Sequence, residues 1–170
     1  EDIGYNSSDA GLDFKTFKYE NRLHAQSADI NQGVVGKGLD EFEGQQGAGD
    51  QGMMFGFACN ETPELMPAPV MYSHQLLLKA TELRKSGEIK WLRPDAKSQV
   101  TIEYEGHKPV HIDTVVISHQ HSPEVSHDEI EKTIIERIIK PVLEPTGLLD
   151  EKTKYYVNPT GRFVTGGPDG

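Results

Sequence analysis

The polar side chains of this 170-residue chain that could take part in chemistry stand where predicted strands end, beside glycine or proline. At such places a ligand's polar groups can meet a rigid scaffold. They form four groups: Gln32, Asp50, Asp95 with Lys97, and Arg162 with Phe163.

The stretch 46–56, Gln-Gly-Ala-Gly-Asp-Gln-Gly-Met-Met-Phe-Gly, surrounds the carboxylate of Asp50 with glycines and amides. Glycine lets a backbone approach a ligand closely. Beyond it, Met53, Phe55 and Phe57 alternate with Met54, Gly56 and Ala58, which predicts a strand with one apolar face. A flexible turn would then place an acid at the mouth of a buried strand. The pattern is equally typical of a glycine-rich loop that only leads into the core.

Each of the other groups also has an ordinary structural interpretation. An aspartate in a glycine loop commonly forms a turn, and Lys97 before a strand is commonly solvated. Arg162 and Phe163 could be a surface charge beside a core ring. The histidines at 119 and 121 favour a solvated pair over a metal site, and no catalytic triad, phosphate loop or zinc pattern is present.

The composition limits the classes of function. The net charge is −10 and the basic residues are scattered, which argues against general binding to nucleic acid or to an anionic membrane. No apolar run approaches ~18 residues, and no signal peptide is evident. The single cysteine, Cys59, excludes an internal disulfide and fits a reducing compartment. The missing initiator methionine and the end within a glycine-rich turn lead us to expect a piece of a longer protein.

The first third of the chain shows weak patterns. Residues 1–23 predict two short strands separated by the turn 6–9, and residues 29–33 predict a loop. The segment 33–49, with six glycines and no period, predicts a mobile linker or lid.

The rest predicts a complete domain. After the strand at 53–58 come a helix at 70–86, a loop at 91–97 fixed by Pro94, and a hairpin at 98–118 that turns at 105–107. Ser126 and Glu129 form a capping box for a second helix that Pro141 closes, and 154–157 is a last strand. This β-α-β-β-α-β order predicts an α+β fold with helices on one face of a mostly antiparallel sheet.

Five ordered motifs in these loops resemble those of S-adenosylmethionine synthetase (methionine adenosyltransferase). They are Asp-Ile-Asn-Gln-Gly at 29–33, Gly-Ala-Gly-Asp-Gln-Gly at 47–52 with Met-Phe-Gly at 54–56, Leu-Met-Pro-Ala-Pro at 65–69, Trp-Leu-Arg-Pro-Asp-Ala-Lys-Ser-Gln-Val at 91–100, and Asn-Pro-Thr-Gly-Arg-Phe at 158–163 with Gly-Gly-Pro at 166–168. The similarity runs through the whole chain.

The resemblance implies a three-domain parent protein in which each domain repeats the β-α-β-β-α-β plan. Residues 1–33 would end the amino-terminal domain, 34–46 would be a gating loop, 47–168 the central domain, and 169–170 the start of a truncated segment. The amino-terminal His-Pro-Asp-Lys motif and the third domain of the family are not in this chain.

The resemblance also implies a reaction. Methionine sulfur would attack the ribose 5′ carbon of ATP and expel tripolyphosphate, which is then hydrolysed, so the parent is expected to be a cytoplasmic transferase of one-carbon metabolism. Lys97 and Asp50 would be catalytic, Asp50 would hold the ribose hydroxyls, and Gln32 the methionine. The ATP-binding positions would be Asp95, Ala96, Lys97, Thr160, Gly161, Arg162 and Phe163.

The family uses Mg²⁺ and K⁺, and the resemblance places no metal ligand within this chain. It implies a homodimer or dimer of dimers with active sites shared between subunits, and no nucleic-acid or membrane partner. The alternative function is a non-catalytic module for nucleotide binding or oligomerisation. The apolar strands at 53–58 and 110–118 could form its contact face, but ordinary core under the helices explains one side of each strand equally well.

Overall fold

A computed structural model describes residues 1–170, which divide into two compact units. The larger unit comprises residues 1–17 and 58–170, and the smaller comprises residues 18–57. None of the helices combines the length and the apolar character that crossing a membrane requires. The predicted domain boundaries concern a longer protein and stay a prediction.

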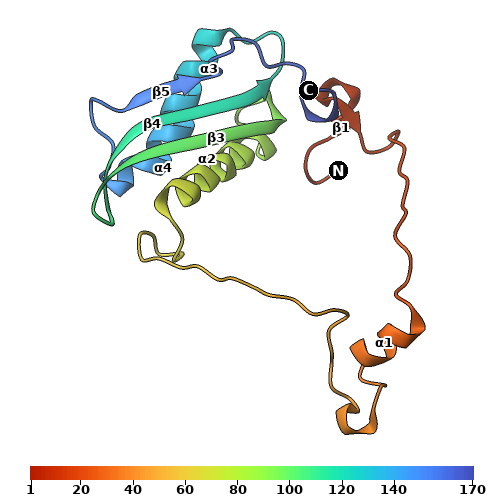
Figure 1. Ribbon diagram of the computed structural model, residues 1–170. Coiled ribbons are helices and arrows are strands. Elements are labelled where there is room, and N and C mark those ends of the chain that lie inside the picture. The colour runs from red at the N-terminus through yellow and green to blue at the C-terminus, as the bar shows by residue number, and fades with distance from the viewer. The chain divides into compact units, whose positions relative to one another are not determined.

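The larger unit is built on a three-stranded sheet with the order β3-β4-β5 (Figure 1). β3 (Leu92–Glu105) and β4 (Lys108–His121) pair antiparallel, and β5 (Lys154–Val157) pairs in parallel with the other edge of β4. The hairpin turns at Gly106, whose φ of 63° lies in the left-handed region that glycine tolerates. The α+β class and the mostly antiparallel sheet are therefore confirmed.

The hairpin is longer than predicted, because β3 begins within the stretch 91–97 that we expected to be a loop. Leu92 lies opposite His121 and the next pair is Ala96 with His119, so the chain bulges over Arg93, Pro94 and Asp95. Proline donates no ladder hydrogen bond, but an edge strand or a bulge accommodates it. The loop prediction is wrong for this reason, and the bulge gives Asp95 its position.

The first helix of the larger unit, α2 (Ala68–Lys85), confirms the helix predicted at 70–86. Leu76, Ala80 and Leu83 recur at helical spacing and are all buried against the sheet. The opposite sheet face, which includes Gln99 and Thr101, stays exposed. The helices therefore cover one face, as the pattern predicts (Figure 1).

The second helical stretch consists of α3 (His127–Ile134), a π turn at Ile135–Ile139 and α4 (Lys140–Leu143). Its predicted cap is confirmed, because the Ser126 hydroxyl accepts a hydrogen bond from the Glu129 N–H at 3.3 Å. The prediction that Pro141 closes the helix is wrong. In a regular α-helix the proline ring clashes with the carbonyl four residues earlier, and the wider π turn displaces that carbonyl.

The strand predicted at 53–58 does not form, so the first strand of the β-α-β-β-α-β plan is missing here. Residues 51–59 carry no strand pairing, and Met53, Met54, Phe55 and Phe57 are 81, 92, 91 and 76 % exposed. Alternation makes a strand only where a neighbouring edge supplies hydrogen bonds and an apolar face. The prediction is wrong for this structure because no such edge is paired with the segment.

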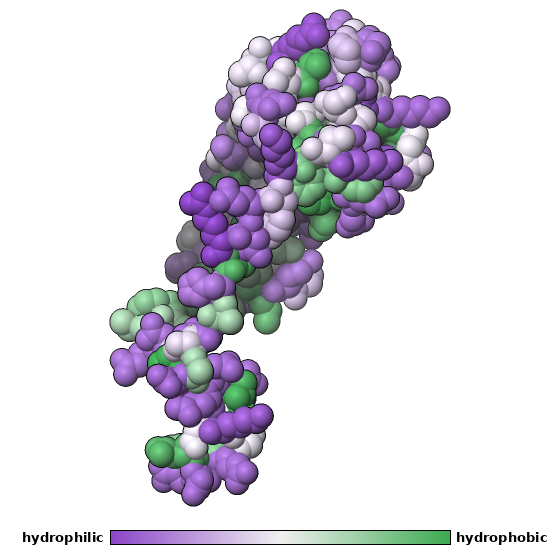
Figure 2. Space-filling view, turned by 90° about the vertical axis from the view of Figure 1, so that its right-hand side faces the viewer, coloured by the Kyte–Doolittle hydropathy of each residue, from purple (hydrophilic) through white to green (hydrophobic).

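The smaller unit contains α1 (Ala28–Val34) where we predicted a loop at 29–33. The Ser27 hydroxyl accepts a hydrogen bond from the Ile30 N–H at 3.4 Å, and Asp29 stands in the first turn, so local capping starts a short helix. Apolar side chains reach the surface of this unit, visible as green spheres in Figure 2. They include Ile30, Val35, Leu39 and Phe42.

Residues 1–17 contain two short strands, β1 (Asn6–Ser7) and β2 (Leu12–Asp13), which form a sheet of their own. β2 agrees with the second predicted strand, but β1 lies within the turn predicted at 6–9, so the position of the first strand is wrong. The turn between β1 and β2 lies at Ser8–Ala10, so it starts two residues later than the turn predicted at 6–9. Hydrogen bonds from Arg84 to the Ile3 carbonyl at 2.8 Å and from Lys85 to Asp2 at 3.0 Å attach this segment to the end of α2.

Candidate nucleotide-binding site

Asp95 and Phe163, which come from two separate motifs, lie side by side at the end of the sheet. The Gly167 N–H donates a hydrogen bond to Asp95 Oδ2 at 2.9 Å. A Cβ atom at Gly166 would lie 3.0 Å from both Asp95 Oδ2 and Phe163 Cε2. The bulge of β3 and the loop after β5 thus meet around Gly166, where only a residue without a side chain fits.

Gln120 joins these two segments from β4. Its Oε1 accepts the Asp95 N–H at 3.3 Å, and its Nε2 donates to the Val164 carbonyl at 3.0 Å. The side chain is buried, so both hydrogen bonds are shielded from water. Gln120 therefore links the Asp95 bulge to the loop that carries Phe163 and fixes the distance between them.

Asn158 begins that loop, and its side-chain amide pairs with the backbone of His119 as the backbone of a neighbouring strand would. Its Oδ1 accepts the His119 N–H at 2.7 Å, and its Nδ2 donates to the His119 carbonyl at 3.1 Å. Its φ of 44° turns the chain out of β5, and its carbonyl accepts the Gly161 N–H at 2.8 Å. Asparagine tolerates this left-handed conformation better than most residues do. The direction of the loop 158–163 is set at this point.

The remaining ATP-binding candidates lie on exposed surface around this centre. Thr160, Gly161 and Arg162 are exposed, Ala96 is half-buried, and Phe163 is half-buried. Arg162 borders a hollow of about 230 Å³ that His121 and His127 also line. Lys97 is exposed on β3 opposite Ser118, on the sheet face without helices, and it makes no ion pair within the chain.

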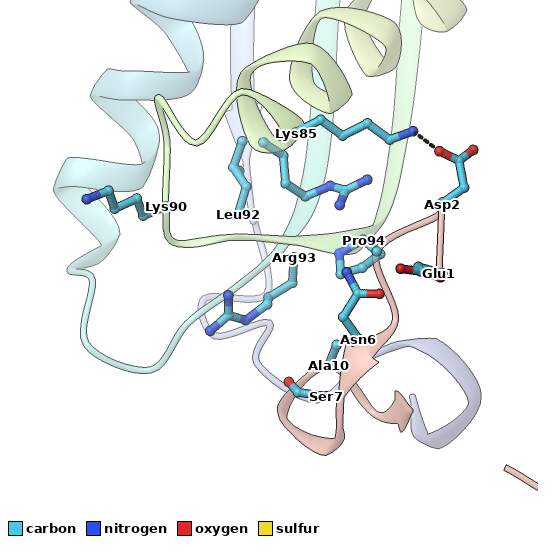
Figure 3. A pocket seen from close by; sticks show the side chains of 12 residues that line it. Glu1, Asp2, Asn6, Ser7, Ala10, Lys85, Lys90, Leu92, Arg93 and Pro94 are labelled. Atoms are coloured by element: carbon cyan, nitrogen blue, oxygen red, sulfur yellow. Dashed lines mark hydrogen bonds and ion pairs between the residues drawn. The ribbon is translucent and has the colours of Figure 1, made fainter. Parts of the chain in front are cut away.

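A larger hollow of about 560 Å³ lies between residues 1–10 and the start of β3. It is rich in cations, but Lys85 is paired with Asp2, and Figure 3 shows Lys90 and Arg93 directed away from that pair. A polyanion site needs cations that converge on one point. This hollow therefore contributes nothing to the nucleotide-binding candidate.

Residues 45–163 match the family model described as S-adenosylmethionine synthetase, central domain. The chain belongs to the S-adenosylmethionine synthetase family. Related synthases match this chain along its whole length. The S-adenosylmethionine synthase of Treponema denticola is 64 % identical over 170 residues, and that of Treponema pallidum (strain Nichols) is 59 % identical over 169. The synthase of Desulfosudis oleivorans is 57 % identical over 169 residues.

These matches cover 99–100 % of this chain but only 42–44 % of the relatives. The chain thus spans less than half the length of the synthases that it resembles. The synthase activity in their names is therefore a property of much longer proteins.

The two remaining family candidates, Gln32 and Asp50, belong to the smaller unit and are exposed. Gln32 lies on α1 and borders a hollow of about 510 Å³ with Leu39 and Phe42. Asp50 Oδ1 accepts the N–H of Gln51 at 2.7 Å, the local bonding of a turn former. Their place relative to Asp95 and Phe163 stays a prediction.

The histidines at 119 and 121 are not the solvated pair that the sequence suggested. They are only 2 % and 5 % exposed, because the end of β4 is covered on both sides. Each Nδ1 bonds to the carbonyl of the next residue, Gln120 at 3.0 Å and Ser122 at 2.8 Å. Burial lowers the pKa of His119 to about 4, so its ring is neutral at pH 7.

Gln120, His121 and Asn158 are the residues of this site that sequence reasoning missed. Their roles come from hydrogen bonds to residues distant in the chain, which no local pattern reveals. One signal was available: the run Ser-His-Gln-His at 118–121 places polar side chains at the end of an otherwise apolar strand. Buried polar runs need internal partners, so this run pointed to a polar network.

Proposed function

We propose that this chain is the central part of a methionine adenosyltransferase that makes S-adenosylmethionine from ATP and L-methionine and hydrolyses the tripolyphosphate. The proposal is carried by one observation. Asp95 and Phe163, assigned to ATP by two different motifs, meet around Gly166. Family membership supports the same reaction, although the chain spans less than half of each named synthase.

In this proposal the adenine ring stacks on Phe163 beside the Arg162 cation. A half-buried ring fits this role, because part of its surface is left open to receive a base. The Asp95 carboxylate uses Oδ2 to hold the Gly167 N–H, and Oδ1 makes no hydrogen bond within the chain. That oxygen is free to accept a donor from the nucleotide.

The proposed chemistry needs little acid–base help. A thioether sulfur is a neutral nucleophile, so no activated serine or cysteine is required. The leaving group is a polyanion, and the main task is to stabilise its growing charge. Lys97 is the candidate for that role, since it is exposed and makes no ion pair within the chain. Asp50 would hold the ribose hydroxyls and Gln32 the methionine, which aligns sulfur and carbon.

The proposal includes Mg²⁺ and K⁺ as ions of the complete protein. Within this chain, no three histidine, cysteine, aspartate or glutamate side chains group so that they could hold a metal ion. Residues beyond this chain would have to complete the sites of both ions in the proposed enzyme.

The proposed partner is a second copy of the protein, in a homodimer or dimer of dimers in the cytoplasm. The sheet face opposite the helices supports this, since it is uncovered and carries Val116 and Tyr156 among polar residues. The other candidate function, a non-catalytic module for nucleotide binding or oligomerisation, rests on this face and on the incomplete set of catalytic groups.

A direct test incubates the full-length protein that contains this chain with ATP, methionine, Mg²⁺ and K⁺. Chromatography should show S-adenosylmethionine in amounts that grow with enzyme concentration, with phosphate and pyrophosphate released. Omission of methionine is the matched control. Nucleotide binding without any S-adenosylmethionine would favour the non-catalytic alternative.

A further inference from the structure

His121 connects the end of β4 to Phe163 through two hydrogen bonds. The His121 N–H donates to the Phe163 carbonyl at 2.9 Å, and the Phe163 N–H donates to His121 Nε2 at 3.0 Å. The other ring nitrogen, Nδ1, lies 2.8 Å from the Ser122 carbonyl. The side chain is 5 % exposed, so water does not compete well for these bonds.

The partners determine where the ring proton is. A carbonyl oxygen only accepts, so Nδ1 must carry the proton that bonds to Ser122. A backbone N–H only donates, so Nε2 must be the unprotonated acceptor for Phe163. Only the neutral imidazole with hydrogen on Nδ1 satisfies both. A second proton on Nε2 would face the Phe163 N–H and remove that hydrogen bond.

We propose that His121 is a positioning residue whose neutral imidazole fixes the Phe163 backbone, and with it the ring that stacks on adenine. The inference rests on the proposed function for the identity of the ligand. Gln120 supports the same loop one residue away through the Val164 carbonyl. With His121 in place, the Phe163 ring stays beside Asp95. Without the Nε2 acceptor of His121, the Phe163 N–H is left unpaired and the loop shifts.

The charges around His121 come from several elements. His127 at the start of α3 and Arg162 on the loop share its hollow, and His119 precedes it on β4. Arg93 and Asp95 lie in the β3 bulge opposite His121, and Glu124 follows in the connection to α3. None of these groups forms a hydrogen bond with the His121 ring, which is held by the Ser122 carbonyl and the Phe163 N–H.

The test uses two variants of the full-length protein. His121→Phe keeps the ring but has no acceptor, and His121→Gln places an amide oxygen near the Nε2 position. We expect His121→Phe to raise the KM for ATP about tenfold and to leave the KM for methionine within twofold. His121→Gln should stay within threefold of the parent for ATP. His127→Phe, which lines the same hollow without bonding to Phe163, is the matched control and should match the parent.

The split between the two KM values gives a readout that a merely structural role would not produce. A general loss of structure would raise the KM for both substrates, whereas His121→Phe should raise the KM for ATP alone and His121→Gln should restore it. Equal losses in His121→Phe and His121→Gln, or a parallel change in the methionine KM, would each overturn the proposal. If His121→Phe does not fold, the ring tautomer of the parent still decides.

A failure of the proposed function is distinguishable from a failure of this inference. Nitrogen-15 NMR of the imidazole reports the ring proton whether or not the protein makes S-adenosylmethionine. A signal for protonated Nδ1 and unprotonated Nε2 at neutral pH is expected. The opposite tautomer would overturn the positioning role, even in an active enzyme.

Discussion

Asp95 and Phe163 in the larger unit are held in a way that Gln32 and Asp50 in the smaller unit are not. Around Asp95 and Phe163, buried polar side chains bridge β3, β4 and the loop after β5. Gln32 and Asp50 are exposed, and the carboxylate of Asp50 bonds only to the next residue. The nucleotide side of the proposed site is thus preformed, whereas the methionine and ribose side must be ordered when substrates bind.

The largest expected effect tests whether the preformed half is sufficient. We predict that purified residues 1–170 make no S-adenosylmethionine from ATP and methionine, even with Mg²⁺ and K⁺. Removal of a single electrostatic donor typically costs about 10²–10³ in rate, and this chain holds Lys97 with no grouped metal ligands. Chromatographic product is measured against the full-length enzyme. Product above the blank, in a preparation free of intact enzyme, would show that one half suffices.

The next effect concerns Lys97 in the full-length protein. A lysine that serves the leaving triphosphate acts mainly in the transition state, so Lys97→Met should lower kcat by about 10²–10³ and change ATP binding far less. Lys108→Met, an exposed lysine at the far end of the hairpin, is the matched control. Turnover within about threefold of the parent would mean that Lys97 is only a solvated surface residue.

A smaller effect is expected at Phe163. Loss of base stacking costs roughly 1–3 kcal/mol, so Phe163→Ala should raise the KM for ATP by about fivefold to 150-fold with little change for methionine. The exposed ring of Tyr19, to which no role is assigned, supplies a control, Tyr19→Ala. Unchanged ATP kinetics in Phe163→Ala would remove this ring from the site.

The polar network of the larger unit should also show in the pH dependence of its stability. Burial lowers the pKa of His119 from its ordinary 6.5 to about 4, so the unfolded chain binds a proton more readily than the folded one. The stabilisation is present above pH 6.5 and is lost as the pH falls toward about 4, amounting to roughly 3 kcal/mol at most. Denaturant midpoints at pH 7.5 and 5 measure it. His119→Gln should show a shallower loss, and an equal loss would contradict the assignment.

The smallest signal is expected from the smaller unit. The segment 33–49 has six glycines and mostly exposed side chains, and its backbone hydrogen bonds are local, such as that from the Gly44 N–H to the Gly36 carbonyl at 2.9 Å. Its amides should therefore exchange with solvent much faster than those of the sheet. Hydrogen exchange on the free protein measures this, with the amides of β4 as the protected reference. Protection throughout the segment would remove the contrast between the two units.

Local chemistry explains why much of the fold could be predicted from the sequence. The capping box at Ser126, the apolar stripe of α2 and the turn at Gly106 each depend on residues a few positions apart. Elements that depend on distant partners were missed. Residues 53–58 alternate like a strand but pair with nothing, and Pro94 looks like a loop residue although the β3 bulge accommodates it.

The residues of the candidate site also divide into those that motifs along the chain reveal and those that depend on distant partners. Asp95 and Phe163 could be found because family motifs name them, and the structure brings them together. The roles of His121 and Asn158 could not be found, although a motif includes Asn158, because their partners lie across the sheet and no spacing along the chain encodes those contacts. Residue type alone also misjudged His119, since a histidine near a strand end can be solvated or buried, and only packing decides.

The parallel pairing of β5 with β4 has a consequence for the order of folding. The β3–β4 hairpin closes through a short turn, whereas the four residues of β5 reach β4 only after the crossover of α3 and α4 is in place. Pairings between distant segments form late because loop closure costs entropy first. The loop with Phe163 follows β5, so we expect it to dock last during folding and to detach first on partial unfolding. A partly unfolded chain can therefore lose the position of this loop and still retain its hairpin and the helix beneath it.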